Sequence, residues 1–236
     1  MADTAIRPWT YTRIDELDPL PYSAEWPSLR SGWGRVDVHS LVASWIQATR
    51  LEGHYFEFGV ASGRSAIAAI RANQRLTPRC IHRYFLFDSF LGLPELVGPD
   101  ADSIQFRKGD YAFGVDDVVT KLETYGVADD AEIILVPGFY QDSLPPFDTG
   151  QLEGKRAAIV HVDVDLHASC AEVLTFITPH LQPGAVLLFD DWNCFGARND
   201  RGERRAVREW LESNRHIRLE SYAKYGWHGE AFLVDF

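Results

Sequence analysis

The sequence predicts an α/β protein whose doubly wound, mostly parallel sheet has seven strands and ends in an antiparallel hairpin. Short apolar runs, typical of buried strands, alternate along the chain with segments whose apolar residues recur at helical spacing. This repetition favours parallel pairing, because a parallel connection needs room for a crossover helix. Polar residues and glycines follow the strands, so we expect ligands at the carboxyl ends of the sheet.

The elements follow one another in a regular order. Residues 36–50 place apolar side chains at helical spacing and are followed by Gly53, so the chain should enter the sheet from a helix. The remaining elements are expected as strand 54–60, helix 65–75, strand 83–90, helix 115–126, strand 132–138, strand 157–165, helix 169–181, strand 184–192, helix 204–214 and strand 230–236. Residues 221–236 should form the closing hairpin, with its turn at YGWHG.

Composition bounds the domain organisation and the partners. The 236 residues suit one α/β domain, which we place at 36–236, and residues 1–35, rich in proline and tryptophan, are expected to form an ordered arm or lid. The tryptophans of this arm would line a substrate wall or anchor the arm to the core or to a second subunit, which favours a homodimer or larger homo-oligomer. The net charge of −11 argues against nucleic acid and acidic membrane surfaces as partners.

The cysteines and the apolar runs indicate a cytoplasmic protein. Cys80, Cys170 and Cys194 are odd in number and form no CxxC pair, which argues against a disulfide framework and against a zinc cluster. The stretch MADTAIRPWTYTR lacks the apolar core of a signal peptide, and no run approaches the ~18 apolar residues of a membrane span.

The stretch YFEFGVASGRSA predicts a strand, a glycine turn and a helix start. Its spacing, Glu57-x-Gly59-x-x-x-Gly63, differs from the dinucleotide fingerprint. A carboxylate at Glu57 would repel a pyrophosphate but attract an ammonium or a sulfonium, whereas Ser62, Gly63 and Ser65 could hold a carboxylate at the helix start. A cationic cofactor that carries an amino-acid group would suit both the Glu57 carboxylate and the helix start. The alternative is a turn whose glycines serve packing only.

Two further strand ends carry groups suited to a nucleoside. Asp88 ends the run LFD, where an acidic residue commonly takes ribose hydroxyls, although it lies further from Glu57 than in dinucleotide-binding folds. Gln141, in VPGFYQDSLP, could offer its amide to a purine edge. An ordinary polar loop is the alternative for this last stretch.

Four carboxylates follow two more strands. Asp163 and Asp165 come directly after the apolar run that begins at AAIV, and Asp190 and Asp191 follow AVLLF. Because both strand ends present carboxylates to the same edge of the sheet, their like charges need a cation. Oxygen ligands suit magnesium or calcium better than zinc, so the sequence predicts a divalent ion of that class.

Together these stretches resemble a known family. The segments FEFGVASGRSA, FDSFLGLPE, GFYQDSLP, HVDVDLHAS, ITPHLQPGA, LFDDW and RRAV resemble class I S-adenosylmethionine-dependent methyltransferases, most closely the macrocin O-methyltransferase family of antibiotic-tailoring enzymes. The resemblance covers roughly residues 36–236. It implies a Rossmann-like sheet and a magnesium-dependent transfer of a methyl group from S-adenosylmethionine to a hydroxyl of a small natural product, such as a sugar moiety.

The resemblance also implies roles for individual residues. Ribose would lie on Asp88 and Ser89, and adenine near Gln141 and Asp142. The methionine part of the cofactor would lie on the turn after the first strand, at Glu57, Gly59, Ala61, Ser62, Gly63 and Ser65. The metal ligands would be Asp163, Asp190 and Asp191, with Asp163 also contacting the cofactor.

The chain departs from these families near the metal site. Leu166 stands where the catechol-type enzymes carry a lysine, and His167 and Ala168 replace a tyrosine and a glutamate of the macrocin-type pattern. His167 is therefore a candidate base, because an imidazole near pKa ~6.5 can accept a proton from an activated hydroxyl. The alternatives are a helix-capping role for His167 and Asp191 or Asp165 as the base.

Two other function classes remain open from the sequence. The DVD stretch is also the D-x-D arrangement of metal-dependent nucleotide-sugar glycosyltransferases, although Glu57 would then face a phosphate-rich donor. A non-catalytic binding protein that kept the cofactor pocket is the third reading, against which the retained carboxylates argue.

Overall fold

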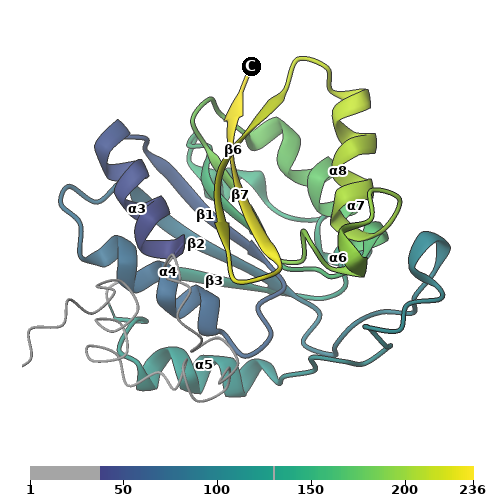
Figure 1. Cartoon of the computed structure of the whole chain (residues 1–236). Coiled ribbons are helices and arrows are strands. Elements are labelled where there is room, and N and C mark those ends of the chain that lie inside the picture. The colour runs from purple at the N-terminus through teal and green to yellow at the C-terminus, as the bar shows by residue number, and fades with distance from the viewer. Residues whose placement is uncertain (1–37, 130) are drawn as a thin grey trace, which may run out of the picture.

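Seven strands form one sheet in the order β3-β2-β1-β4-β5-β7-β6 in the computed structural model, which describes residues 38–129 and 131–236 (Figure 1). The first five pair in parallel, and β7 runs antiparallel between β5 and β6. The predicted fold class is therefore confirmed. The strands are β1 (Gly53–Phe58), β2 (Ile81–Asp88), β3 (Glu132–Pro137), β4 (Ala157–Val162), β5 (Val186–Phe189), β6 (Arg218–Tyr225) and β7 (Gly229–Asp235).

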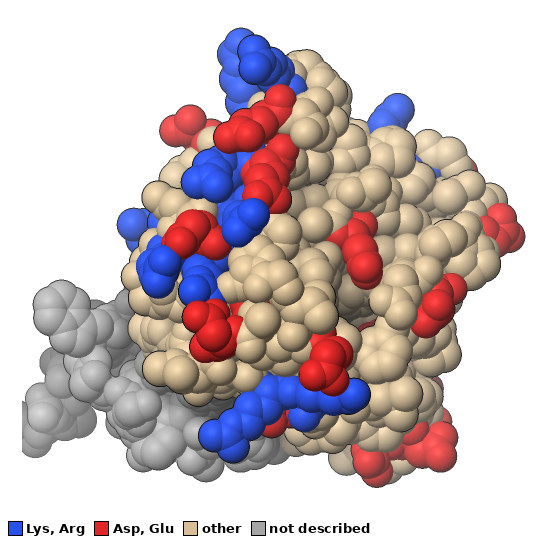
Figure 2. Space-filling view, turned by 90° about the vertical axis from the view of Figure 1, so that its right-hand side faces the viewer, with Lys and Arg blue, Asp and Glu red and all other residues tan. Residues whose placement is uncertain are grey.

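Helices cover both faces of the sheet. On one face lie α3 (Val38–Thr49), α4 (Arg64–Gln74) and α5 (Val115–Thr124), and on the other lie α7 (His167–Ile177) and α8 (Gly202–Ser213), with the short α6 (Tyr140–Ser143) beside α7 (Figure 1). Four 3-10 turns complete the described part: η2 (Gly98–Asp100), η3 (Thr149–Leu152), η4 (Thr178–His180) and η5 (Phe195–Ala197). None of the described helices is long and apolar enough to cross a membrane. On one face of the molecule, Lys and Arg side chains lie interspersed with Asp and Glu side chains (Figure 2).

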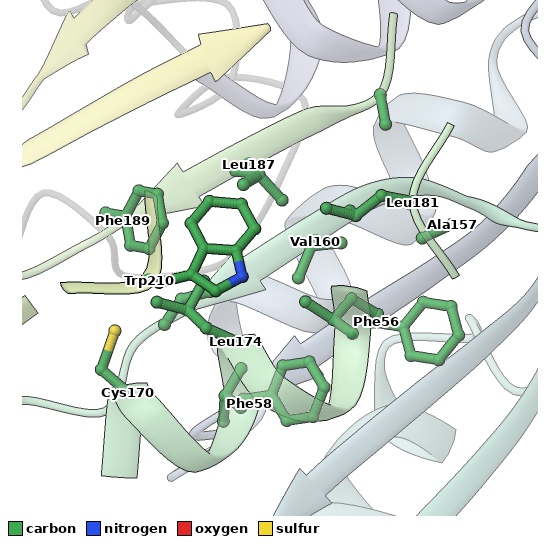
Figure 3. Close-up of a cluster of buried hydrophobic side chains, with 14 of the residues drawn as sticks. Phe56, Phe58, Ala157, Val160, Cys170, Leu174, Leu181, Leu187, Phe189 and Trp210 are labelled. Carbon is green, nitrogen blue, oxygen red and sulfur yellow. The ribbon is translucent and has the colours of Figure 1, made fainter. Parts of the chain in front are cut away.

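The core divides into two clusters because successive strand residues point to opposite faces. On the side of α7 and α8, fully buried Phe58 and Phe87 stack with ring centroids 4.8 Å apart. Trp210, which lies in the same apolar cluster as Phe58 (Figure 3), donates its indole N–H to Thr178 Oγ1 at 2.8 Å. Aromatic pairs of this kind contribute ~0.5–1.5 kcal/mol beyond the burial of their area. This packing joins β1 to β2 and α8 to η4 on that side of the sheet.

The strand register decides which residues leave the sheet together. Phe87, Phe58, Val162 and Phe189 form one row across β2, β1, β4 and β5. The residues that follow this row therefore emerge side by side at the carboxyl edge: Asp88, Gly59, Asp163 and Asp190. Strand order reverses between β1 and β4, and such a switch point opens a crevice for ligands.

Several predicted boundaries move by a few residues. The strand predicted at 157–165 ends at Val162, because the chain leaves the sheet there and Asp165 adopts a left-handed conformation with φ +59°. The helix predicted at 169–181 begins at His167 and becomes a 3-10 turn at Thr178, next to Pro179. The arm predicted at 1–35 lies outside the described residues, so the domain boundary remains a prediction.

Candidate active site

A cavity of about 660 Å³ opens at the carboxyl edge of the sheet. Its floor includes the row of residues that leave β1, β2, β4 and β5, and α4 forms one wall. The loop between β2 and α5 and the turn between β6 and β7 also line the cavity. A cavity of this size holds a drug-sized ligand, and its place at the switch point makes it the candidate active site.

The turn between β1 and α4 packs directly against the end of β4. Gly59 has φ +89°, and a Cβ built on it would lie 1.7 Å from the carbonyl oxygen of Asp163, so only glycine fits there. Gly63, with φ +77°, begins α4 without a side-chain cap. Ala61, Ser62 and Ser65 line the cavity beside it. The predicted cofactor turn therefore lies directly next to the first aspartate of the acidic cluster.

Glu57 lies beneath this turn rather than in the cavity wall. It is fully buried, and its carboxylate accepts hydrogen bonds from Ser65 Oγ at 2.7 Å and from Tyr55 OH at 2.5 Å. Glu57 is not among the described residues that line the cavity. Glu57 can therefore fix the hydroxyl of Ser65 and lend negative charge to the turn, without an exposed oxygen for a ligand.

Asp88 lines the cavity and organises the two strand ends beside it. Its Oδ2 accepts the amides of Val60 and Ala61, each at 2.8 Å, and its Oδ1 accepts the amide of Phe90 at 2.7 Å. Ser89 also lines the cavity and donates to the carbonyl of Gly92 at 2.8 Å. Asp88 thus joins the turn after β1 to the end of β2.

The residues predicted near adenine separate in the structure. Gln141, at the start of α6, is exposed and lines the cavity. Asp142 is exposed as well, but it is not among the lining residues. The structure therefore brings Gln141 to the site and leaves Asp142 outside the cavity wall.

The four aspartates after β4 and β5 all line the cavity, and three of them hold a proton more tightly than usual. Burial raises the pKa of Asp163, Asp165 and Asp191, and the neighbouring carboxylates raise it further. For Asp190, burial also opposes ionisation, but its histidine neighbours outweigh burial and lower its pKa. The cluster therefore carries more negative charge than its surroundings neutralise.

Histidines stand between the acidic cluster and the turn after β1. The buried His161 places Nδ1 3.8 Å from Glu57 Oε2 and Nε2 3.7 Å from Asp190 Oδ1. Burial alone would lower the pKa of His161, but Asp190 and Glu57 raise it well above its usual value. His228, in the turn between β6 and β7, places Nδ1 3.4 Å from Asp190 Oδ2. Asp190 is therefore the aspartate of the cluster that has histidine partners.

The donor chemistry at this edge fits a hard divalent ion, because the ligands on offer are carboxylate oxygens with unneutralised charge. Within the described ranges, no group of three or more His, Cys, Asp or Glu side chains converges on a common point. Asp191 accepts hydrogen bonds from the amide of Asp165 at 3.0 Å and from Cys194 Sγ at 3.2 Å, and Asp190 faces its two histidines. Binding an ion would therefore require rotation of carboxylate side chains.

The His167 imidazole points away from the cavity. Its Nε2 lies 2.8 Å from Glu209 Oε2 on α8, and its backbone amide donates to Asp100 Oδ2 at 2.5 Å. The described lining residues include its neighbours Asp165 and Ala168 but not His167. The ring does not cap α7 and does not reach the site as a base, because it pairs with Glu209 on α8. Asp165 and Asp191 do line the cavity.

Sequence reasoning missed Glu203, the second residue of α8. The carboxylate is 1% exposed, and its Oε2 accepts the amide of Asp191 at 3.1 Å, while Oε1 has no hydrogen-bond partner in the described part of the chain. Burial raises its pKa well above the usual value, with Asp191 and Asp163 adding to the shift. An acidic residue in the first turn of a helix was the available signal, but helix periodicity alone gave no reason to bury it.

Exposed aromatic side chains line the outer part of the cavity. Tyr111 and Phe113, on the loop after β2, and Trp227, in the turn between β6 and β7, are 54%, 39% and 56% exposed. Partial burial raises the pKa of Tyr111 to about 12, with the charges of Asp165 and Asp191 adding to the shift. The sequence analysis did not single out these residues.

Comparison with known proteins decides the family. The family model described as macrocin O-methyltransferase (TylF) matches residues 22–218. The chain belongs to the macrocin O-methyltransferase family. The protein is therefore an O-methyltransferase, as the sequence predicted, and the glycosyltransferase and binding-protein alternatives are wrong.

A sequence relative supports this family membership, and solved structures share the fold. The chain is 30% identical over 199 residues, 80% of this chain and 73% of the relative, to 8-demethyl-8-(2,3-dimethoxy-alpha-L-rhamnosyl)-tetracenomycin-C 4'-O-methyltransferase of Streptomyces olivaceus. Its fold is similar to that of the O-methyltransferase NovP, with a TM-score of 0.66, 19% identity, and 84% and 78% of the two chains covered. It is also similar to TomG of Streptomyces achromogenes in complex with S-adenosylmethionine, with a TM-score of 0.53, 20% identity, and 90% and 84% covered.

Proposed function

We propose that this enzyme transfers a methyl group from S-adenosylmethionine to a sugar hydroxyl of a glycosylated natural product, with a divalent cation, preferably Mg²⁺, at the acidic cluster. The contact between Gly59 and the Asp163 carbonyl carries this proposal, because it joins the cofactor turn to the carboxylates within one cavity. The Streptomyces olivaceus relative is named for methylating a rhamnosyl tetracenomycin, which supports an acceptor of this class.

The cofactor would lie across the ends of β1 and β2. The uncapped start of α4 can hold the carboxylate of the methionine part, because its first amides have no intrahelical partner. Asp88 accepts three backbone amides, yet each carboxylate oxygen has two lone pairs, so it can still accept a ribose hydroxyl. Gln141 can reach the adenine edge from α6. TomG, which shares this fold, has been solved with S-adenosylmethionine bound.

Asp163, Asp190 and Asp191 would hold the cation. When bound, it would lower the pKa of the acceptor hydroxyl and fix its oxygen near the sulfonium methyl. Asp165 and Asp191 are the residues of this chain placed to accept the hydroxyl proton. The acceptor oxygen then forms the new C–O bond as the bond from methyl carbon to sulfur breaks, leaving S-adenosylhomocysteine. His161 lines the cavity beside Asp190, whereas Glu57 lies buried outside the cavity wall and contacts His161 from there.

The outer cavity suits a neutral or cationic acceptor with a flat hydrophobic part. Tyr111, Phe113 and Trp227 offer ring faces on which a sugar or an aromatic aglycone can pack. The arginines among the described lining residues are Arg64, Arg71 and Arg75, all in or at the end of α4, whereas Glu95 and Asp110 lie on the loop after β2. A diphosphate would therefore meet negative charge where the acceptor binds.

A calorimetric titration with S-adenosylmethionine in the presence of Mg²⁺ tests the cofactor part of the proposal. We expect micromolar affinity for the wild type, about tenfold weaker binding for Asp88→Asn, and wild-type affinity for Asp116→Asn, whose exposed side chain lies outside the cavity. A folded wild type that does not bind S-adenosylmethionine would contradict the proposed function.

Two expectations from the sequence extend the proposal. A homodimer or larger homo-oligomer would be detected by light scattering at micromolar concentration, and a cytoplasmic location by cell fractionation. A monomer throughout that range would contradict the first expectation, and recovery from the membrane or secreted fraction the second.

A further inference from the structure

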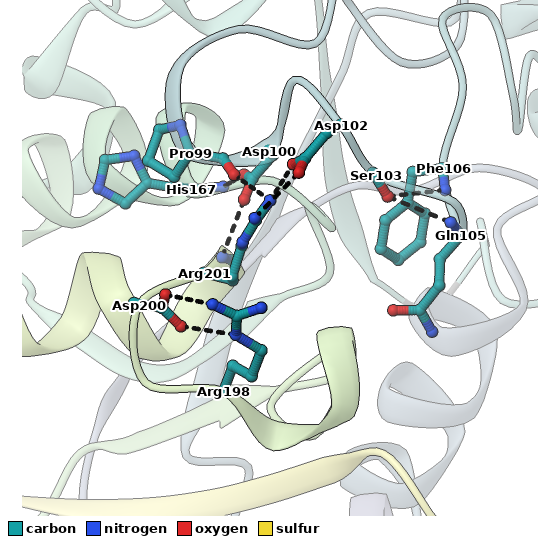
Figure 4. A network of polar contacts seen from close by, with 11 residues as sticks. Pro99, Asp100, Asp102, Ser103, Gln105, Phe106, His167, Arg198, Asp200 and Arg201 are labelled. Carbon is teal, nitrogen blue, oxygen red and sulfur yellow. Dashed lines mark hydrogen bonds and ion pairs between the residues drawn. The ribbon is translucent and has the colours of Figure 1, made fainter.

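Asp100 caps two helices at once. This residue of η2 is 1% exposed, and its carboxylate accepts the amide of His167 at 2.5 Å and the amide of Gly202 at 3.1 Å (Figure 4). These are the first residues of α7 and α8, and neither helix has a side-chain cap from its own N-cap residue. A carboxylate at a helix start satisfies orphan amides and interacts favourably with the helix dipole.

Further hydrogen bonds connect the start of α8 to the acidic cluster. Glu203 follows Gly202 and accepts the amide of Asp191, and Asp191 in turn accepts the amide of Asp165, two residues before His167. Three carboxylates thus receive four backbone amides in a closed ring. This ring joins the start of α7, the start of α8 and the end of β5, the segments that carry or adjoin the acidic cluster.

Asp100 belongs to the loop that lines the acceptor side of the cavity. Arg201 pairs with Asp102 and donates to the carbonyl of Pro99, which fastens this loop to the start of α8 (Figure 4). Further along the loop, Phe106 packs against Leu166 and Cys194, next to the aspartates of the cluster. The loop is therefore fixed to the same two segments that the Asp100 carboxylate connects.

We propose that Asp100 is a positioning residue that couples the acceptor-side loop to the acidic cluster. Its carboxylate fixes the first backbone amides of α7 and α8 relative to each other. Glu203, the second residue of α8, in turn fixes the backbone amide of Asp191. The consequence for acceptor binding and methyl transfer rests on the proposed function. The consequence for backbone protection depends on the fold alone.

Hydrogen exchange of the full-length protein tests the coupling without any substrate. In Asp100→Asn we expect the amides of Asp165 and Asp191, which Asp100 does not touch, to exchange about tenfold faster, together with His167 and Gly202. A residue that only caps helices would accelerate His167 and Gly202 alone, and that result would overturn the proposal. Asp200→Asn, which removes a solvent-exposed ion pair with Arg198 outside the ring, should leave Asp165 and Asp191 protected as in the wild type.

A second variant, Glu203→Ala, removes a different carboxylate of the ring. If Asp100→Asn does not fold, Glu203→Ala should accelerate exchange at His167 as well as at Asp191, because coupling between two sites is reciprocal. Acceleration confined to Asp191 would overturn the proposal.

Kinetics separate this proposal from the proposed function. In Asp100→Asn the acceptor KM should rise or kcat should fall about tenfold while the Kd of S-adenosylmethionine stays within about twofold of the wild type. A wild type that transfers no methyl group would contradict the proposed function and leave the exchange experiment valid. Normal transfer by Asp100→Asn would contradict the coupling alone.

Discussion

Gly59 lies against the backbone carbonyl of Asp163, so closely that a Cβ at residue 59 would stand 1.7 Å from that oxygen. The register row across β2, β1, β4 and β5 brings these two residues out of the sheet as neighbours. The turn proposed for the cofactor and the carboxylates proposed for the cation therefore share one rigid junction. Any side chain at residue 59 must push the two apart.

Gly59→Ala should lower the free energy of unfolding by at least ~3 kcal/mol, because it combines a left-handed backbone with a backbone clash. Gly154→Ala is the matched control, since Gly154 has φ +75° and open space around its Cα. We expect the control to cost about 1–2 kcal/mol, the conformational part alone. Urea unfolding of both variants measures the difference, and equal costs would mean that the contact with Asp163 is relaxed in solution.

Trp227→Ala should raise the acceptor KM about tenfold and leave the Kd of S-adenosylmethionine unchanged, because the ring lines the acceptor side of the cavity. Phe236→Ala serves as the control, since Phe236 is 50% exposed and does not line the cavity. Steady-state kinetics with varied acceptor provide the measurement. An unchanged KM in Trp227→Ala would remove this residue from the acceptor wall.

His167→Ala should retain activity within about threefold of the wild type, because its imidazole faces Glu209 and not the cavity. Asp191→Asn, by contrast, should lose at least about 10²-fold in kcat as both a proposed ligand and a candidate base. The two rates are compared at saturating acceptor and cofactor. A loss in His167→Ala as large as that in Asp191→Asn would restore the histidine as the base.

Acid should destabilise the protein partly through His54, which is 1% exposed near the start of β1. Burial lowers the pKa of His54, with His82, Arg83 and Lys155 adding to the shift and its hydrogen bond to the Leu152 carbonyl opposing it. A depressed folded-state pKa gives stability that is present above the unfolded pKa of ~6.5 and is lost as the pH falls through the folded pKa.

His54→Leu should therefore flatten the dependence of unfolding free energy on pH below about 6.5. Each proton taken up on unfolding changes the slope by at most about 1.4 kcal/mol per pH unit. Urea titrations at pH 7.5 and 5.5 give the slope for the wild type and the variant. Parallel slopes would show that His54 does not stay neutral in the folded protein.

The sheet and the floor of the site could be predicted from the sequence, because both depend on strand periodicity. Buried apolar runs mark the strands, and the polar residues after them must meet at one edge, which located Asp88, Asp163 and Asp190. Side-chain direction could not be predicted, because it depends on partners distant in sequence. Glu209 draws His167 away from the cavity, and Tyr55 and Ser65 hold Glu57 beneath the turn.

The long loop after β2 was the main gap in the sequence analysis. It has no helical or alternating period, so nothing in its local sequence shows that Asp100 is buried between two helix starts. Glu203 was hidden for a related reason, since a charged residue near a helix start is usually solvated. Both residues acquire their surroundings only when α7, α8 and the loop meet.

The most direct test of the central claim is the rate of methyl transfer from isotope-labelled S-adenosylmethionine to a rhamnosyl tetracenomycin, the acceptor in the name of the Streptomyces olivaceus relative, with Mg²⁺ or with a chelator. We expect labelled product with Mg²⁺, its loss on chelation with recovery when Mg²⁺ is returned, and no turnover by folded Asp163→Asn. Transfer at the wild-type rate in the chelator, or by Asp163→Asn, would contradict a cation held by the aspartates after β4 and β5.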